Sequence, residues 1–121
     1  MSWEDITYFT PEEFQCSHCG KEEMDLHFVR LLDELRRKLG FPLKISSGYR
    51  CPTYNDQVSS TGKDGPHTTG KAADIQVHYG DARLLLDEVW DVFEGIGINQ
   101  KGPIDGRFIH LDLCGLRVWS Y

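Results

Sequence analysis

Three side chains in the second half of the chain are of the types that bind zinc in hydrolases. His67 and Asp74 are seven positions apart and are joined by a small link that contains Gly70, and His110 follows in a later apolar segment. Zinc in a hydrolase typically takes three ligands from His, Asp and Glu and leaves a fourth position for water. A link that turns lets His67 and Asp74 point at one ion, and a strand carrying His110 could pair beside them. These residues therefore predict a mononuclear zinc site of hydrolytic type.

A polar turn upstream of these residues supplies a cation. Residues 43–46 alternate apolar and polar side chains as a strand does, and they lead into Ser47-Gly48-Tyr49-Arg50. Side chains just past a strand end often face a cleft, where a guanidinium can bind a carboxylate or a developing oxyanion. The alternative is a surface arginine in a turn. We predict that Arg50 acts in catalysis and that Arg50 and its neighbour Tyr49 bind substrate.

Four cysteines form a second group with metal-binding or redox chemistry. Cys16 and Cys19 have the spacing of a zinc knuckle or a redox pair, whereas Cys51 and Cys114 are far apart in the sequence. All four could converge as a structural zinc site or as two disulfides. Because residues 1–5 are acidic and lack the segments of a secretory signal, free thiols are the default expectation. The sequence leaves these alternatives open.

Helices and strands alternate around these residues. Apolar residues recur at three- and four-residue steps over residues 25–39 and 81–93, which predicts two amphipathic helices, and a shorter helix is expected over residues 52–58. Strands are expected over residues 43–46, 73–78, 108–113 and 116–119, and residues 95–98 are expected to form a tight turn into a further strand. The last two strands are expected to form a hairpin. This order predicts an α+β fold with a small, mainly antiparallel sheet flanked by helices.

Length and composition predict one domain that spans residues 1–121. The hydrophobic fraction of 40% and the aromatic fraction of 12% suit a buried core and argue against disorder. No apolar run approaches the roughly 18 residues of a membrane helix, so no membrane span is expected. The net charge of −6 argues against a nucleic-acid partner, because such proteins concentrate basic surface against phosphates. We expect a monomer that is made in the cytoplasm without a signal peptide.

Four motifs occur in order along the chain: Ser47-Gly48-Tyr49-Arg50, His67-x-x-Gly70-x-Ala72-x-Asp74-Ile75, Gly95-Ile96-Gly97 and Phe108-Ile109-His110-Leu111-Asp112. Together they resemble the zinc D-Ala-D-Ala carboxypeptidase family, which includes D,D-dipeptidases, phage L-alanyl-D-glutamate endolysins, cell-wall D,D-endopeptidases and the hedgehog signalling fold. The resemblance runs over residues 14–113, and residues 14–20 are similar to its short, phage-associated branch. It implies a hedgehog/DD-peptidase-like fold in which His67, Asp74 and His110 bind Zn²⁺. It also implies that Arg50 orients substrate or stabilises its oxyanion.

Two positions depart from the pattern of this family. Gly65 stands where many relatives have a serine, and Arg107 stands where several relatives place the catalytic carboxylate. The missing acid favours a second class of function, a zinc-bearing peptide or cell-wall binding module that has lost turnover. A third hypothesis is a structural zinc protein built on the four cysteines, with the histidines incidental.

The departure at Arg107 leaves the catalytic base to be argued from chemistry, because peptide hydrolysis needs a group that passes a proton to the leaving amine. Asp112 shares a strand face with His110 and is one candidate, although it could equally fix a ligand imidazole. Asp105, in the loop before that strand, is the other main candidate, and His78 is a further one.

The leading hypothesis is a zinc metallopeptidase that hydrolyses amide bonds in peptidoglycan stem peptides or cross-links, of D,D- or L,D-carboxypeptidase or endopeptidase type. Its catalytic residues are predicted to be Arg50 with Asp105 or Asp112, and its cofactor Zn²⁺. The protein is expected to be a phage or prophage lysis enzyme, a virion component or a cytoplasmic enzyme.

Overall fold

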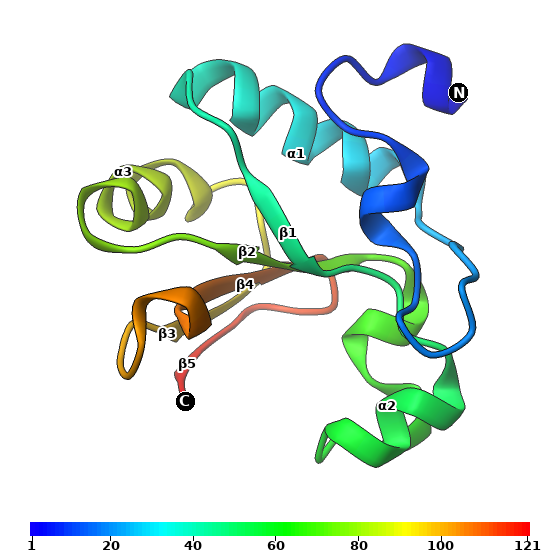
Figure 1. The fold of residues 1–121 in the computed structure, drawn as a ribbon. Coiled ribbons are helices and arrows are strands. Elements are labelled where there is room, and N and C mark those ends of the chain that lie inside the picture. Colours follow the sequence, from blue (N-terminus) through cyan, green and yellow to red (C-terminus); the bar gives the residue numbers. More distant parts are fainter.

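Five strands form one sheet at the centre of the molecule, in the order β1-β2-β4-β3-β5 (Figure 1). The computed structural model describes residues 1–121, and its strands are β1 (Lys44–Ser47), β2 (Ala72–Gln76), β3 (Gly95–Asn99), β4 (Phe108–Asp112) and β5 (Arg117–Ser120). β2 pairs antiparallel with β1 and β4, and β3 pairs antiparallel with β4, whereas β3 and β5 run parallel. The sheet is mainly antiparallel, and the predicted α+β fold class is confirmed.

Three α-helices and five short 3₁₀ helices precede or connect the strands. The α-helices are α1 (Leu26–Leu39), α2 (Pro52–Val58) and α3 (Tyr79–Val89), so α3 begins and ends earlier than the predicted helix over residues 81–93. The 3₁₀ helices are η1 (Trp3–Asp5), η2 (Pro11–Phe14), η3 (Gly62–Asp64), η4 (Pro66–Thr69) and η5 (Ile104–Gly106). α1 contacts α3, whereas α2 lies apart from both and contacts η3 and η4 (Figure 1). None of the helices combines the length and the apolar character that crossing a membrane requires.

The helix α1 begins and ends where its flanking residues predict. Asp25 accepts a hydrogen bond from the backbone N–H of Phe28, and Gly40 closes the helix in the left-handed region with a φ of 78°. The apolar face of α1 is buried in the core through Phe28, Val29, Leu32 and Leu35. The predicted helix over residues 25–39 is therefore confirmed, with Asp25 as its cap.

The two faces of the sheet carry different kinds of side chain, because successive residues of a strand point to opposite sides. Ile75, Ile109 and Leu111 are fully buried and belong to the same hydrophobic core as the apolar face of α1. Asp74 and His110 alternate with these apolar residues along β2 and β4, and they face the other side. The alternation thus builds the core on one face of the sheet and collects polar groups on the other.

A row of paired residues crosses all five strands at the level of Asp74. The register places side by side, in this order, Ser47, Asp74, His110, Gly97 and Trp119. Gly97 makes room for the indole ring of Trp119, because a Cβ at this position would lie 2.6 Å from Trp119 Cε2. The sheet therefore sets the aromatic ring, the imidazole and the carboxylate in one line.

The predicted hairpin of the last two strands is wrong. β5 cannot pair with β4, because β2 and β3 already occupy both edges of that strand, and it instead joins the open edge of β3 in parallel. Glu94, just before β3, holds the segment that leads from β4 into β5 through two hydrogen bonds. Its carbonyl accepts from the backbone N–H of Arg117 at 2.9 Å, and its carboxylate accepts from the backbone N–H of Gly115 at 2.8 Å.

Candidate metal centre

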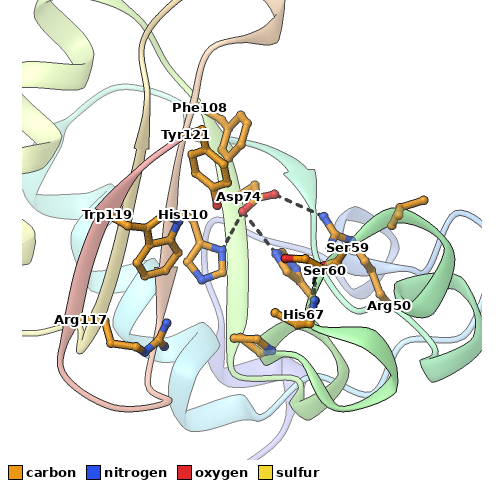
Figure 2. Close-up of a pocket in the computed structure, with 13 residues that line it drawn as sticks. Arg50, Ser59, Ser60, His67, Asp74, Phe108, His110, Arg117, Trp119 and Tyr121 are labelled. Atoms are coloured by element: carbon orange, nitrogen blue, oxygen red, sulfur yellow. Dashed lines mark hydrogen bonds and ion pairs between the residues drawn. The ribbon is translucent and has the colours of Figure 1, made fainter.

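His67, Asp74 and His110 meet on the polar face of the sheet (Figure 2). His67 comes from η4, Asp74 from β2 and His110 from β4, and all three are buried. The Nε2 atom of His67 lies 3.3 Å from Oδ1 of Asp74, and the Nδ1 atom of His110 lies 2.9 Å from the same oxygen. One ligand atom from each residue lies within 4.8 Å of the other two. The structure thus brings together the three residues that the sequence indicated.

The link between His67 and Asp74 turns at Gly70. This residue has a φ of 75°, which favours glycine, and a Cβ there would collide with the backbone carbonyl of Glu23. The carbonyl of Gly70 accepts a hydrogen bond from the backbone N–H of Asp25 at 2.9 Å. Close packing against the segment before α1 therefore requires glycine, and the turn carries the chain from η4 into β2.

The ring of His67 is oriented by the loop that precedes α2. Its Nδ1 atom lies 2.8 Å from the carbonyl oxygen of Gly48. A carbonyl only accepts hydrogen bonds, so Nδ1 carries a hydrogen and donates it. Nε2, which faces Asp74, is therefore the ring atom that can bind a metal, and the bond to Gly48 turns the ring for this role.

The ring of His110 lies between two carboxylates. Its Nδ1 atom faces Asp74, and its Nε2 atom lies 2.7 Å from Oδ2 of Asp112. Asp112 is fully buried and also accepts hydrogen bonds from the Arg117 guanidinium and from the backbone N–H of Cys114, each at 2.8 Å. Burial raises the pKa of Asp112, but the hydrogen bonds from His110, Cys114 and Arg117 outweigh burial and lower it.

The two carboxylates also set the protonation of the cluster. Burial raises the pKa of Asp74, but hydrogen bonds from His110 and His67 outweigh it, and the net pKa lies below the usual range. Burial lowers the pKa of His110, but hydrogen bonds to Asp112 and Asp74 outweigh it and raise the pKa above its ordinary value. A cation that binds to Nδ1 of His110 must therefore displace a firmly held proton.

The donor set of these three residues fits zinc. Two imidazole nitrogens and one carboxylate oxygen are the kind of ligands that catalytic zinc sites use, with a fourth position left open. Buried charges in proteins are paired or bind metals, and the ionised Asp74 carboxylate supplies negative charge where the two rings converge. The hydrogen bonds to Gly48 and Asp112 fix both rings from behind, as metal-binding histidines require.

A pocket of about 390 Å³ opens over the three residues. Arg50 lies on one side of Asp74 and Trp119 on the other (Figure 2). The Nη2 atom of Arg50 lies 3.6 Å from Oδ2 of Asp74. Its Nε donates to Ser47 Oγ at 3.1 Å and its Nη1 donates to Asn55 Oδ1 at 3.2 Å, so the guanidinium is fixed in the pocket wall. The structure therefore places Arg50 where the sequence predicted it.

Four other residues with predicted roles lie outside the pocket lining: Tyr49, Asp105, Asp112 and His78, which is exposed. Tyr49 is buried in the hydrophobic core, which corrects the prediction that it binds substrate. Burial and the nearby Glu23 raise the pKa of Tyr49 to about 12, so it stays neutral there. Asp105 is exposed on η5, and Asp112 lies on the far side of the His110 ring from Asp74.

The last strand and the residue that follows it supply pocket residues that no sequence motif indicated. Arg117, Trp119 and Tyr121 all line the pocket. The ring centroid of Trp119 lies 5.1 Å from that of His110. These three large side chains alternate along the chain, and the two-residue period of a strand is the signal that could have grouped them on one face.

Comparison with known proteins agrees with this geometry. The family model described as Peptidase M15 matches residues 7–112, a range that contains His67, Asp74 and His110. No curated protein and no solved structure matches the chain.

Proposed function

The chain belongs to the Peptidase M15 family, and we propose that it is a zinc metallopeptidase that hydrolyses amide bonds in peptidoglycan peptides. The proposal covers D,D- and L,D-type carboxypeptidase or endopeptidase reactions, carried out by a monomer in a phage or prophage setting. The observation that carries it is the convergence of His67, Asp74 and His110 beneath a pocket whose wall contains Arg50.

The metal would be bound by Nε2 of His67, a carboxylate oxygen of Asp74 and Nδ1 of His110. Zinc in such a site supplies Lewis acidity, which polarises an amide carbonyl and makes water acidic enough to attack near neutral pH. The Gly48 carbonyl and the Asp112 carboxylate keep the two rings aimed at the ion through hydrogen bonds of 2.8 Å and 2.7 Å.

Arg50 is the residue that we assign to the substrate. Its guanidinium is fixed by Ser47 and Asn55 and faces the metal-binding carboxylate, so little conformational freedom remains to be lost when a ligand binds. A fixed guanidinium suits either a free peptide carboxylate or the oxyanion that develops on the scissile carbonyl. Stem peptides of peptidoglycan offer both groups.

We assign Asp112 to the orientation of His110 and not to proton transfer. Its oxygens already accept hydrogen bonds from His110, Arg117 and the backbone of Cys114, and it lies outside the pocket lining. Asp105 stays a prediction for the proton-transfer group, because it is exposed on η5 and a substrate has to bring it into reach.

A second function is favoured by one feature of the pocket. Asp74 is the single carboxylate among its lining residues, and Asp74 is itself assigned to the metal. A zinc-bearing module that binds cell-wall peptides without cleaving them needs no proton-transfer group, and the same geometry supports it.

Digestion of purified peptidoglycan separates the two functions. The zinc-loaded protein is incubated with the polymer, and new amino groups and muropeptides are followed by mass spectrometry, with His67→Ala as the metal-site control. A peptidase releases new amino groups with the wild-type chain and not with His67→Ala. If neither protein releases any while zinc-loaded wild type sediments with the polymer, the binding module is correct.

A further inference from the structure

Three of the four cysteines come together at a second site, which shares no residue with the pocket lining. Cys16 and Cys19 flank the turn that follows η2, and Cys51 is the residue that precedes α2. Their Sγ atoms all lie within 4.8 Å of one another. Figure 1 shows the segment after η2 beside the start of α2. Cys114 is exposed and does not join this cluster, so of the alternatives that the sequence left open, a site formed by all four cysteines is not present.

The imidazole of His18 lies next to Cys51 and offers a fourth donor. Its Nδ1 atom lies 3.6 Å from the Sγ atom of Cys51. A tetrahedral zinc ion bound at about 2.3 Å to sulfur and about 2.0 Å to nitrogen separates two such ligand atoms by about 3.5 Å, which is close to this distance. The His18 ring is stacked on Tyr54 with centroids 5.6 Å apart and planes at 5°, so the ring is already held in this position.

The backbone around Cys16 is folded as a metal-binding turn requires. The backbone N–H of Gly20 donates to the carbonyl of Cys16 at 2.8 Å, and Gly20 has a φ of 76°, which favours glycine. The backbone N–H of Cys16 donates to the carbonyl of Lys21 at 2.8 Å, and that of Cys51 points at the Cys16 sulfur at 3.4 Å. This tight turn brings the sulfur atoms of Cys16 and Cys19 together.

We propose that Cys16, His18, Cys19 and Cys51 bind a second, structural zinc ion. A disulfide would use two of the three sulfurs and leave the third, with the imidazole, without a function. Four donors of the Cys₃His type instead fill all positions of a tetrahedral ion and leave none for substrate, which is the arrangement of structural zinc sites. The site is independent of the proposed peptidase function, because it shares no ligand with His67, Asp74 and His110.

The second ion would fix the segment that positions the pocket residues. The backbone N–H of Tyr49 donates to the carbonyl of Phe14 at 2.9 Å, and Gly48 packs so closely that a Cβ there would lie 2.6 Å from Phe14 Cα. The backbone N–H of Arg50 donates to the carbonyl of His67 at 3.2 Å. A zinc ion shared between Cys16 and Cys51 would add a further link between these two segments, next to Arg50.

The test is zinc analysis on the full chain carrying His67→Ala, which removes a ligand of the first centre and leaves the second intact. Purified under reducing conditions, this protein is expected to keep one zinc per chain, and a thiol-specific mercurial is expected to release it. Cys19→Ser in the same background should reduce the zinc content to near zero, and Cys19 is preferred to Cys16 because it is exposed and outside the core. The matched control is Cys114→Ser, another exposed cysteine, which should leave the zinc in place.

Thiol alkylation supplies a readout that needs no substitution. With zinc present, Cys114 of the wild-type chain should react at once, whereas Cys16, Cys19 and Cys51 should be protected until a chelator is added. In particular, exposed Cys19 should be protected by the metal although it is open to solvent. The proposal is overturned if His67→Ala carries no zinc, or if Cys19 and Cys114 alkylate equally fast with zinc in excess. Loss of peptidoglycan hydrolysis with this protection unchanged would count against the peptidase function alone.

Discussion

His110 donates from Nε2 to a fully buried carboxylate, Asp112, at 2.7 Å, while its Nδ1 faces Asp74 at 2.9 Å. The pair makes Asp112 a support for the imidazole and places it on the opposite side of the ring from the pocket. In zinc sites, such supporting carboxylates fix the ring orientation and raise the basicity of the ligand nitrogen. This contact therefore favours a supporting role for Asp112 over a role as the catalytic base.

Asp112→Asn should weaken zinc binding. The amide keeps the size of the side chain but loses the charge that orients His110, and loss of such a partner typically costs about 10- to 100-fold in metal affinity. Competition with a chromophoric chelator measures this change, with Asp105→Asn as the matched carboxylate control that should bind zinc normally. Undiminished zinc affinity in Asp112→Asn, together with lost turnover, would instead identify Asp112 as the base.

Arg50→Ala should lower kcat/KM without loss of zinc. Removing one donor that stabilises a developing oxyanion typically costs about 10²- to 10³-fold. Arg50→Lys should recover little, because an ammonium cannot reproduce the fork that contacts Ser47 and Asn55. Steady-state kinetics on a defined stem peptide measure both variants. Arg107→Ala is the control, since Arg107 lies outside the pocket lining and should leave the rate unchanged.

Zinc affinity should increase as the pH rises from about 6 to about 8. The pKa of His110 is raised by Asp112 and Asp74 against the effect of burial, so zinc competes with a proton that becomes easier to remove at higher pH. Titrations with a competing chelator at several pH values measure the trend, and buffered calorimetry measures the released proton. A zinc affinity that does not change over this range would contradict the assignment of His110 Nδ1 as a ligand.

In the metal-free chain, the contribution of His110 to folding stability should decrease as the pH rises, whereas zinc affinity increases. Because the folded pKa of His110 is raised, its contribution is complete below the unfolded pKa of about 6.5 and is lost as the pH rises through the folded value. The lowered pKa values of Asp74 and Asp112 stabilise the fold above about pH 4, and this contribution is lost as the pH falls through the folded values. Urea unfolding of the chelator-treated protein measures both limbs.

Gly97→Ala should destabilise the sheet beside the metal centre. The added Cβ would lie 2.6 Å from the indole of Trp119, which has to move off its position next to His110, and overpacking of this kind typically costs about 1–3 kcal/mol. Urea unfolding measures the loss. Gly106→Ala is the control, because nothing lies within 4 Å of a Cβ there, and equal stabilities for the two variants would show that Trp119 is not held in place.

Local patterns were sufficient to predict the elements that carry the ligands. The leucine periodicity and the Asp25 and Gly40 caps located α1, and the alternation around Asp74 and His110 located β2 and β4. Ligand chemistry made His67, Asp74 and His110 a candidate set, and the family resemblance selected them from the other histidines and carboxylates of the chain. The Peptidase M15 match bears out this resemblance.

Features that depend on which strand edge is free could not be predicted from local patterns. β5 was expected beside β4, but β3 occupies that edge, so Trp119 and Arg117 reach the centre from a strand that pairs in parallel with β3. The direction of a loop side chain was equally undetermined. Tyr49 and Arg50 are neighbours in the sequence, yet Tyr49 enters the core and Arg50 enters the pocket.

The central claim is that His67, Asp74 and His110 hold a zinc ion at the floor of the pocket, and an anomalous-difference map from zinc-loaded crystals tests it most directly. The claim predicts a peak about 2.0–2.2 Å from His67 Nε2, His110 Nδ1 and an oxygen of Asp74, with the fourth position facing Arg50. A map without density at this position, from crystals in which zinc is bound elsewhere on the chain, would contradict it.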